Sequence, residues 1–162
     1  MLSCCTKKVH PVGKGELTDE HKRLIKTVWS DLREQIGEVG MESFLRFFNT
    51  HPEAQDSFLV FKDIPREELS QSIKLKEHGL KVTSVVDRCV NRLDDPNAMK
   101  NIATQLGKYH ERGLLLKYQT ALRDSYIDAI KMRSTIVWNS KCQEAWITFF
   151  DKFQKELAEA SC

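Results

Sequence analysis

Apolar residues recur along most of the chain at the three- and four-residue spacing of an amphipathic helix, and no stretch alternates as a strand would. Residues 1–17 lack this periodicity and contain a proline and two glycines, so we interpret them as a flexible leader. From Thr18 onward the pattern is helical throughout. The sequence therefore predicts an all-α domain over residues 18–162, preceded by the leader.

Local signals bound the first three predicted helices. Thr18 is a good N-cap and is followed by two acidic residues, which favour the start of a helix. Gly37 is predicted to end this helix. The second helix is rich in phenylalanine and ends at His51-Pro52. Pro52 can open a short third helix that runs to about Phe58, because proline has no N–H to lose at that position.

After the short third helix, the pattern predicts a loop and then one helical turn after Pro65. Four longer helices are predicted to follow in the second half of the chain. The apolar face of the first of them is expected to run from Ile73 to Leu93. The four helices cover residues 72–93, residues 98–112 closed by Gly113, residues 116–132, and a last helix that opens with a capping box at Ser140–Gln143 and reaches about residue 157.

Six long helices and one or two short ones are more numerous and less even than in an up-down bundle. The short helix that begins at Pro52 breaks the parallel arrangement and leaves room for a pocket. The domain is also long enough to bury a substantial core without disulfides. The expected architecture is therefore a single helical domain built around a cavity.

Composition excludes several classes of function. The 25 basic and 23 acidic residues are mixed along the chain, so there is no basic stripe for nucleic acid. No apolar run approaches the roughly 20 residues of a membrane-spanning helix, and none follows the first methionine as in a secretory signal. No glycine-rich phosphate loop or nucleophile elbow is present. We expect a cytoplasmic protein.

The five cysteines indicate free thiols rather than a disulfide framework, because their number is odd and no CxxC pair occurs. Cys89 lies on an inward helix face and is expected to be an inert core thiol. Cys4 and Cys5 precede two lysines, a setting for dual palmitoylation and association with the inner face of the plasma membrane. The alternative for this pair is a disordered tail with exposed thiols.

Two histidines, His78 and His110, lie on separate predicted helices 32 residues apart. A single histidine on an amphipathic helix is usually structural. Two of them on helices that face each other can hold a metal or a flat metallo-cofactor from both sides, because neutral imidazole is a good ligand for transition metals. The intervening chain is long enough to let the two helices face each other.

Around this pair the chain carries, in order, His51-Pro52-Glu53, Phe58, Phe61-Lys62, Lys76-Glu77-His78-Gly79 with Val82, and Leu106 before His110. This ordered set resembles the globin family, over about Thr18 to Leu157. Trp29 also falls where the first helix of that family commonly carries tryptophan.

The resemblance implies haem b as the cofactor. It implies that His110 is the proximal iron ligand, that His78 faces the iron from the distal side and that Phe58 stacks on the porphyrin. Six further residues complete the implied pocket: Leu106 beneath the porphyrin, Val82 limiting the distal space, Phe44 roofing the distal side, Tyr118 and Leu122 on the proximal wall, and Lys81 toward a haem propionate.

The separation of the histidines and Lys81 beside Val82 resemble the six-coordinate globins, such as neuroglobin and globin X, in which the distal histidine binds iron when no ligand is present. We hypothesise bis-histidine coordination by His78 and His110. The implied function is reversible binding of O2, NO or CO, with electron transfer or redox signalling through an unidentified redox partner.

Three other hypotheses about the function remain open from the sequence. Nitrite reduction and NO scavenging are side chemistries that would make the protein an enzyme. A five-coordinate oxygen-storage globin is one alternative to the bis-histidine reading. A globin-fold sensor or interaction module without haem is another, although the presence of both histidines and Phe58 argues against it.

Overall fold

The computed structural model describes residues 15–161, and every regular element in that range is a helix, which confirms the all-α prediction. No helix in this range is long and apolar enough to cross a membrane. Cys4 and Cys5, with most of the predicted leader, lie outside the described residues. Six α-helices and three short 3-10 helices follow one another as α1 Asp19–Asp31, η1 Arg33–Gln35, α2 Ile36–Thr50, η2 Pro52–Ser57, η3 Arg66–Gln71, α3 Ile73–Val90, α4 Ala98–Gly107, α5 Arg112–Arg133 and α6 Ser140–Ala160.

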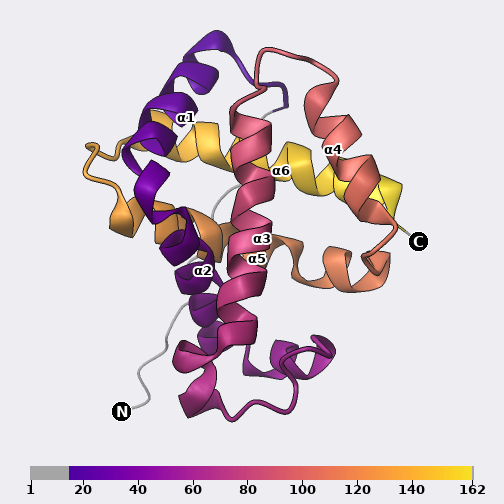
Figure 1. Cartoon of the computed structure of the whole chain (residues 1–162). Helices are drawn as coiled ribbons and strands as arrows, with labels where there is room; N and C mark the ends of the chain where they lie inside the picture. Colours follow the sequence, from indigo (N-terminus) through magenta and orange to yellow (C-terminus); the bar gives the residue numbers. More distant parts are fainter. Residues whose placement is uncertain (1–14, 162) are drawn as a thin grey trace, which may run out of the picture.

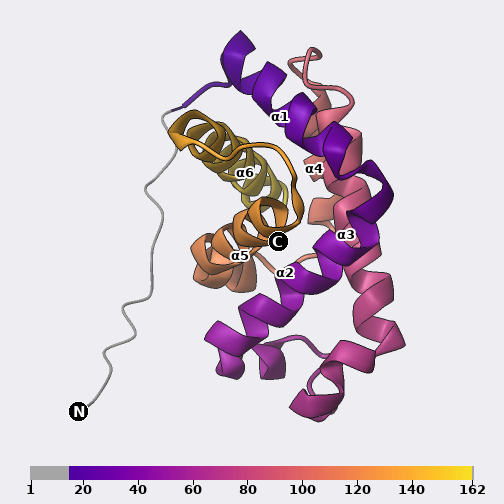
Figure 2. The ribbon, with the colours of Figure 1, turned by 90° about the vertical axis from the view of Figure 1, so that its left-hand side faces the viewer.

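The helices cross one another at steep angles rather than lying parallel (Figure 1). In that view α3 stands upright in front of α5 and α6, and α6 runs across behind it. The view turned by a quarter shows α1 and α2 descending along α3, with α5 and α6 packed on the other side (Figure 2). The most extensive helix pairs are α2 with α3, α2 with α5 and α4 with α6. This crossed arrangement leaves a space enclosed by helices from both halves of the chain.

Side chains cap three of the helices. Thr18 accepts a hydrogen bond from the backbone N–H of His21, whose ring accepts one from the N–H of Thr18. Ser72 caps α3 with one hydrogen bond, which its hydroxyl oxygen accepts from the backbone N–H of Leu75. The predicted capping box at Ser140–Gln143 is wrong, because α6 is capped one residue earlier by Asn139, whose side-chain oxygen accepts a single hydrogen bond from the N–H of Cys142.

The predicted end of the first helix at Gly37 is wrong, because α1 ends at Asp31 and Gly37 lies in the first turn of α2. The helix end is set by a contact with a distant segment. The Asp31 carboxylate accepts hydrogen bonds from Ser134 and Thr135, which follow α5, and these bonds hold Asp31 at the end of α1. Ile73 is also misplaced by the sequence pattern, since it is 73% exposed at the start of α3, where no neighbouring element covers it.

The helix predicted over residues 98–112 ends earlier than its pattern suggests. Helix α4 stops at Gly107, and His110 lies in the turn before α5 instead of on the helix. Gly113 is therefore not a C-cap but part of the first turn of α5. Gly107 packs so closely on the end of α6 that a β-carbon there would lie 2.3 Å from the Ala160 carbonyl oxygen. This contact fixes the point at which α4 ends.

Two hydrophobic clusters form the interior. The main core joins α1, α3, α4, α5 and α6 around the tilted ring pair of Trp29 and Trp146. It also buries Cys89, and burial raises the pKa of that thiol to about 12, in agreement with an inert core thiol. The second cluster is mainly aromatic and joins α2, the segment after it, the start of α3, and α5. Its buried members are Phe44, Phe47, Phe48, Ala54, Phe61, Leu69, Leu75 and Tyr118.

The backbones of α2 and α3 touch where Gly40 crosses Gly79. A β-carbon on Gly40 would lie 2.3 Å from the Gly79 carbonyl oxygen, and one on Gly79 would lie 2.8 Å from the Gly40 carbonyl carbon. Both distances are shorter than real contacts of this kind, and the groups they meet are backbone atoms that cannot swing aside. Glycine at both positions is therefore a condition for this helix crossing.

We expect Gly40→Ala to lower the free energy of unfolding by about 2 kcal/mol, because it overpacks a backbone contact. The matched control is Gly37→Ala on the same helix, whose β-carbon would meet only the Leu80 side chain, at 3.8 Å. The control should leave stability unchanged or raise it slightly. Urea unfolding followed by circular dichroism measures both changes, and equal stabilities would contradict this account of the crossing.

Candidate functional site

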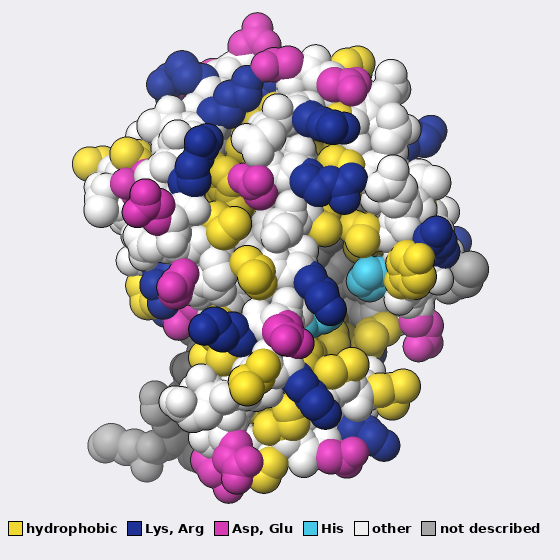
Figure 3. Space-filling model, in the orientation of Figure 1, with side chains coloured by type: hydrophobic (Ala, Val, Ile, Leu, Met, Phe, Trp, Pro, Cys, Tyr) yellow, Lys and Arg dark blue, Asp and Glu magenta, His cyan; other side chains and the backbone are white. Residues whose placement is uncertain are grey.

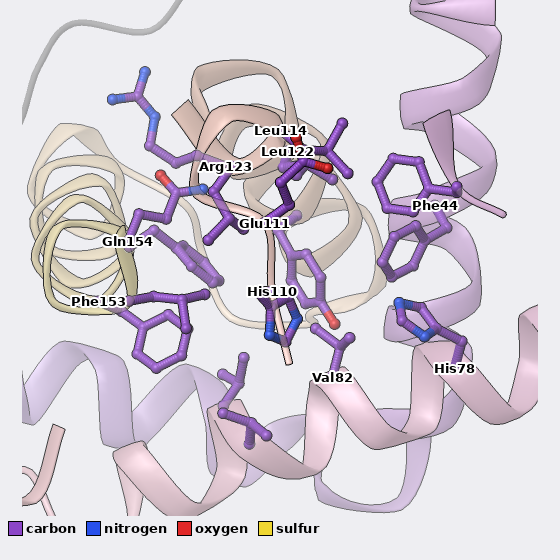
Figure 4. Close-up of a pocket in the computed structure, with 17 residues that line it drawn as sticks. Phe44, His78, Val82, His110, Glu111, Leu114, Leu122, Arg123, Phe153 and Gln154 are labelled. Atoms are coloured by element: carbon purple, nitrogen blue, oxygen red, sulfur yellow. The ribbon is translucent and has the colours of Figure 1, made fainter. Parts of the chain in front are cut away.

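An apolar cavity opens between α2, α3, α5, α6 and the turn that carries His110 (Figure 4). The empty space at this site, counted together with its open mouth, is about 950 Å³. Histidine side chains reach the surface at the edge of a hollow, with hydrophobic side chains around it (Figure 3). The cavity is lined by Phe44, Phe58, His78, Val82, Val85, Val86, His110, Glu111, Leu114, Leu115, Leu122, Arg123, Tyr126, Phe150, Phe153, Gln154 and Leu157.

His110 is fixed by a hydrogen bond to the backbone. Its Nδ1 lies 2.9 Å from the carbonyl oxygen of Leu106, one turn earlier in the chain. A carbonyl oxygen can only accept, so Nδ1 is the donor in this bond and Nε2 is the ring nitrogen that the bond leaves unengaged. The ring is half-buried at the cavity wall. The end of α4 therefore sets the orientation of the His110 ring and of its Nε2.

His78 projects from α3 into the same cavity and is held by aromatic rings. The Phe44 ring meets it edge-on with centroids 5.0 Å apart, and the Phe61 ring does so at 5.3 Å. Burial is the main cause that lowers the pKa of His78 below its ordinary value of 6.5, and the charges of a protonated His110 and of Lys81 lower it further. The ring is therefore neutral at neutral pH and its lone pair is available.

The two imidazoles face the same space from different elements, with Val82 between them (Figure 4). The part of the chain between the two histidines folds so that α3 supplies one and the turn after α4 supplies the other. Imidazole nitrogens on two walls of an apolar cavity suit a metal that is already held in a flat organic ring.

Of the nine residues that the sequence predicts for the site, the structure brings six to the cavity wall and places three elsewhere. Leu106 packs against the main core and reaches the site only through its carbonyl group. Lys81 is exposed and acts on His78 through its charge. Tyr118 is buried against Phe47, and its hydroxyl has no hydrogen-bond partner. The six at the wall are Phe44, Phe58, His78, Val82, His110 and Leu122.

Several residues that shape the site gave no signal in the sequence. Arg123 lies on the wall although it is 3% exposed, and its guanidinium donates to Asp124 at 2.9 Å and to Asp151 at 2.8 Å. The Tyr126 hydroxyl shares a 2.7 Å hydrogen bond with Thr83, which ties α5 to α3. The two residues of each of these hydrogen-bonded pairs lie between one and 43 positions apart in the sequence. No regular spacing along the chain therefore revealed the pairs.

The Globin family model matches residues 41–157, most of the chain. Cytoglobin-2 of Danio rerio is 30% identical over 95 residues, 58% of this chain and 53% of that protein. The chain thus spans about half the length of the cytoglobins it matches. A longer match joins 86% of this chain to 89% of anaerobic nitrite reductase HBII of Casuarina glauca, at 26% identity.

Two solved structures share the fold. The hemoglobin of the botfly Gasterophilus intestinalis superposes with a TM-score of 0.74 at 24% identity, over 89% of this chain and 97% of that one. The neuroglobin of the acoel Symsagittifera roscoffensis superposes with a TM-score of 0.77 at 16% identity, over 88% of this chain and 98% of that one. The globin-like fold expected from the sequence is thereby confirmed.

The lowered pKa of His78 predicts a pH dependence of stability in the protein freed of any cofactor. Below its ordinary pKa of 6.5 the unfolded chain binds a proton at His78 more readily than the folded chain does. Stability is therefore lost as the pH falls from 6.5 toward the folded pKa, and it is retained above 6.5.

We expect His78→Gln to remove this contribution. Urea unfolding at pH 7.5 and pH 5.5 should show a larger loss of stability on acidification in the unaltered chain than in the variant. The comparison isolates His78, because the other histidines are unchanged between the two proteins. An identical loss in both would show that the imidazole is not desolvated in the folded chain.

Proposed function

This chain belongs to the globin family, and from that premise we propose that it is a haem protein whose iron is bound by both His110 and His78 at rest. The cofactor of the family is haem b. When bound, the haem iron supplies reversible binding of diatomic gases such as O2 and a one-electron change of oxidation state. We propose that the protein uses these properties in redox signalling or electron transfer.

The residues of the cavity fit such a group. The wall is mainly aliphatic and aromatic, as a flat and largely apolar macrocycle requires. Phe58 stands at the cavity with its ring edge-on to Phe44 and Phe48, so it is braced from two sides. Lys81 is exposed on α3 three residues after His78, and we propose that its ammonium group pairs with a haem propionate. His110 would hold the iron through Nε2, since Nδ1 is engaged by Leu106.

The observation that carries the bis-histidine proposal is the position of His78. Its ring is directed into the cavity, is neutral and is packed between two phenylalanine rings. An imidazole that served only to donate a hydrogen bond from the cavity mouth would not need this enclosure. The packing favours a ring that stays inside the cavity and acts as an internal ligand.

An internal ligand changes how the protein responds to an external one. His78 must leave its position before another molecule can take it, so the apparent affinity falls by the fraction of time that the position is open. Two imidazole ligands that stay in place in both oxidation states also keep structural reorganisation small. For these two reasons we favour electron transfer or redox signalling as the function. Oxygen storage would be the function of the alternative, a five-coordinate globin.

The absorption spectrum of the purified protein tests the proposal. We expect low-spin, six-coordinate spectra in both the ferric and the ferrous state at neutral pH. His78→Leu should give a high-spin spectrum and bind carbon monoxide more than tenfold faster, because the internal competitor is gone. His110→Ala should lose most of its haem during purification, because the oriented ligand is missing.

A high-spin ferric spectrum of the unaltered protein would overturn the bis-histidine part and favour an oxygen store. A colourless protein that does not take up added haem would overturn the haem part as well. Phe153→Leu is a useful control for the variants, since it alters the same cavity wall without touching either imidazole. It should retain the six-coordinate spectrum.

Nitrite reduction is a second candidate activity, favoured by the similarity over most of both chains to the nitrite reductase of Casuarina glauca. The ferrous protein mixed with nitrite without oxygen should release nitric oxide, which an electrode detects. His78→Leu should release it faster, because the site is open in that variant. No nitric oxide beyond that of the haem-free chain would rule the activity out.

A further inference from the structure

A buried glutamine fixes the loop that joins η2 to η3. Gln55 is 6% exposed, and its side-chain Nε2 donates hydrogen bonds to the carbonyl oxygens of Phe61 and Ile64, each at 2.8 Å. Carbonyl oxygens only accept, so the amide must present its NH2 group to the loop. Both protons of that group are used, and the amide therefore holds two points of the loop at once.

The loop carries Phe61, and Phe61 touches His78. The Phe61 ring is 1% exposed, lies edge-on to His78 with centroids 5.3 Å apart and stacks against Phe58 at 6.3 Å. The Phe44 ring meets His78 at 5.0 Å. His78 thus sits between one ring on a helix, Phe44, and one ring on a loop, Phe61.

These two supports differ in rigidity. Phe44 belongs to α2, which is held by its own backbone hydrogen bonds and by the crossing with α3. The loop has no such framework, and its residues Leu59 and Val60 are 78% and 57% exposed. Apart from local turn bonds, the loop is held by the packing of Phe58, Phe61 and Ile64 in the aromatic cluster and by the two hydrogen bonds from Gln55. Removing those bonds would free the Phe61 support before the Phe44 support.

We propose that Gln55 is a positioning residue that sets how readily His78 leaves the cavity, because it holds Phe61 against the imidazole ring. The inference rests on the proposed function, in which His78 competes with external ligands. It assigns the control of that competition to a side chain that reaches neither the cavity nor the imidazole. Loosening the loop should let His78 leave more often and so expose the binding position more often.

Carbon monoxide binding to the reduced holoprotein measures this step. At high carbon monoxide the observed rate reaches a plateau that equals the rate at which His78 leaves. We expect Gln55→Met, which keeps the volume but removes both donors, to raise the plateau about two- to fivefold. Phe61→Leu should raise it about two- to tenfold, the range expected for losing one aromatic pair.

Two comparisons separate positioning from general loss of stability. Gln143→Met removes the acceptor of the Trp138 indole N–H near the start of α6, away from the loop. It should destabilise the protein and leave the plateau unchanged. Hydrogen exchange of the amides of residues 58–64 should rise in Gln55→Met and stay unchanged in Gln143→Met, which reports on the loop without reference to ligand binding.

The double variant Gln55→Met/Phe61→Leu tests whether Gln55 acts through Phe61. If it does, adding Gln55→Met to Phe61→Leu should change the plateau less than twofold. Independent multiplication of the two effects, or an unchanged plateau in Gln55→Met, would overturn the inference while leaving the bis-histidine proposal intact. A rate that rises linearly with carbon monoxide in the unaltered protein, with no plateau, would overturn the proposed function and this inference with it.

Discussion

The site depends on the contact between Gly40 and Gly79. With no side chain at either position, α2 and α3 approach until their backbones touch. His78 directly precedes Gly79 on α3, and Phe44 lies one turn beyond Gly40 on α2. The close crossing therefore carries the Phe44 ring to within 5.0 Å of the His78 ring. A wider separation of the helices would leave the imidazole without this support, so the geometry of the distal wall follows from two missing β-carbons.

The two histidines are held by different kinds of force, and this difference assigns their roles. His110 is held by a directional hydrogen bond to the end of a helix, which fixes both its tautomer and its orientation. His78 is held by edge-to-face ring contacts, which are weaker and tolerate rotation. A ligand held in this second way can leave and return without breaking the fold. The asymmetry supports the proposal that His78, rather than His110, is the side chain that yields to an external molecule.

The sequence predicted the helices and both histidines because their signals are local: apolar periodicity, caps and a proline. It misplaced His110 on a helix because the end of α4 is set by the packing of Gly107 on Ala160, 53 residues later. The end of α1 was misjudged for a similar reason, since Asp31 bonds to residues beyond α5. Gln55 escaped notice because a glutamine after a proline in a short polar helix has no pattern of its own. The contacts between segments that are far apart in the chain could not be predicted from these local signals.

Val82 shows how the two cores meet at the site. It packs against both the main core and the aromatic cluster, and it stands between the two imidazoles. The main core holds the wall near α4 and α6, while the aromatic cluster holds α2 and the loop that carries Phe61. Motion of the loop can therefore be confined to the aromatic cluster, because the main core on the other side of Val82 does not contain it. This division lets the distal wall loosen while the turn that holds His110 stays fixed, which is the mechanical requirement of a site with one permanent and one exchangeable ligand.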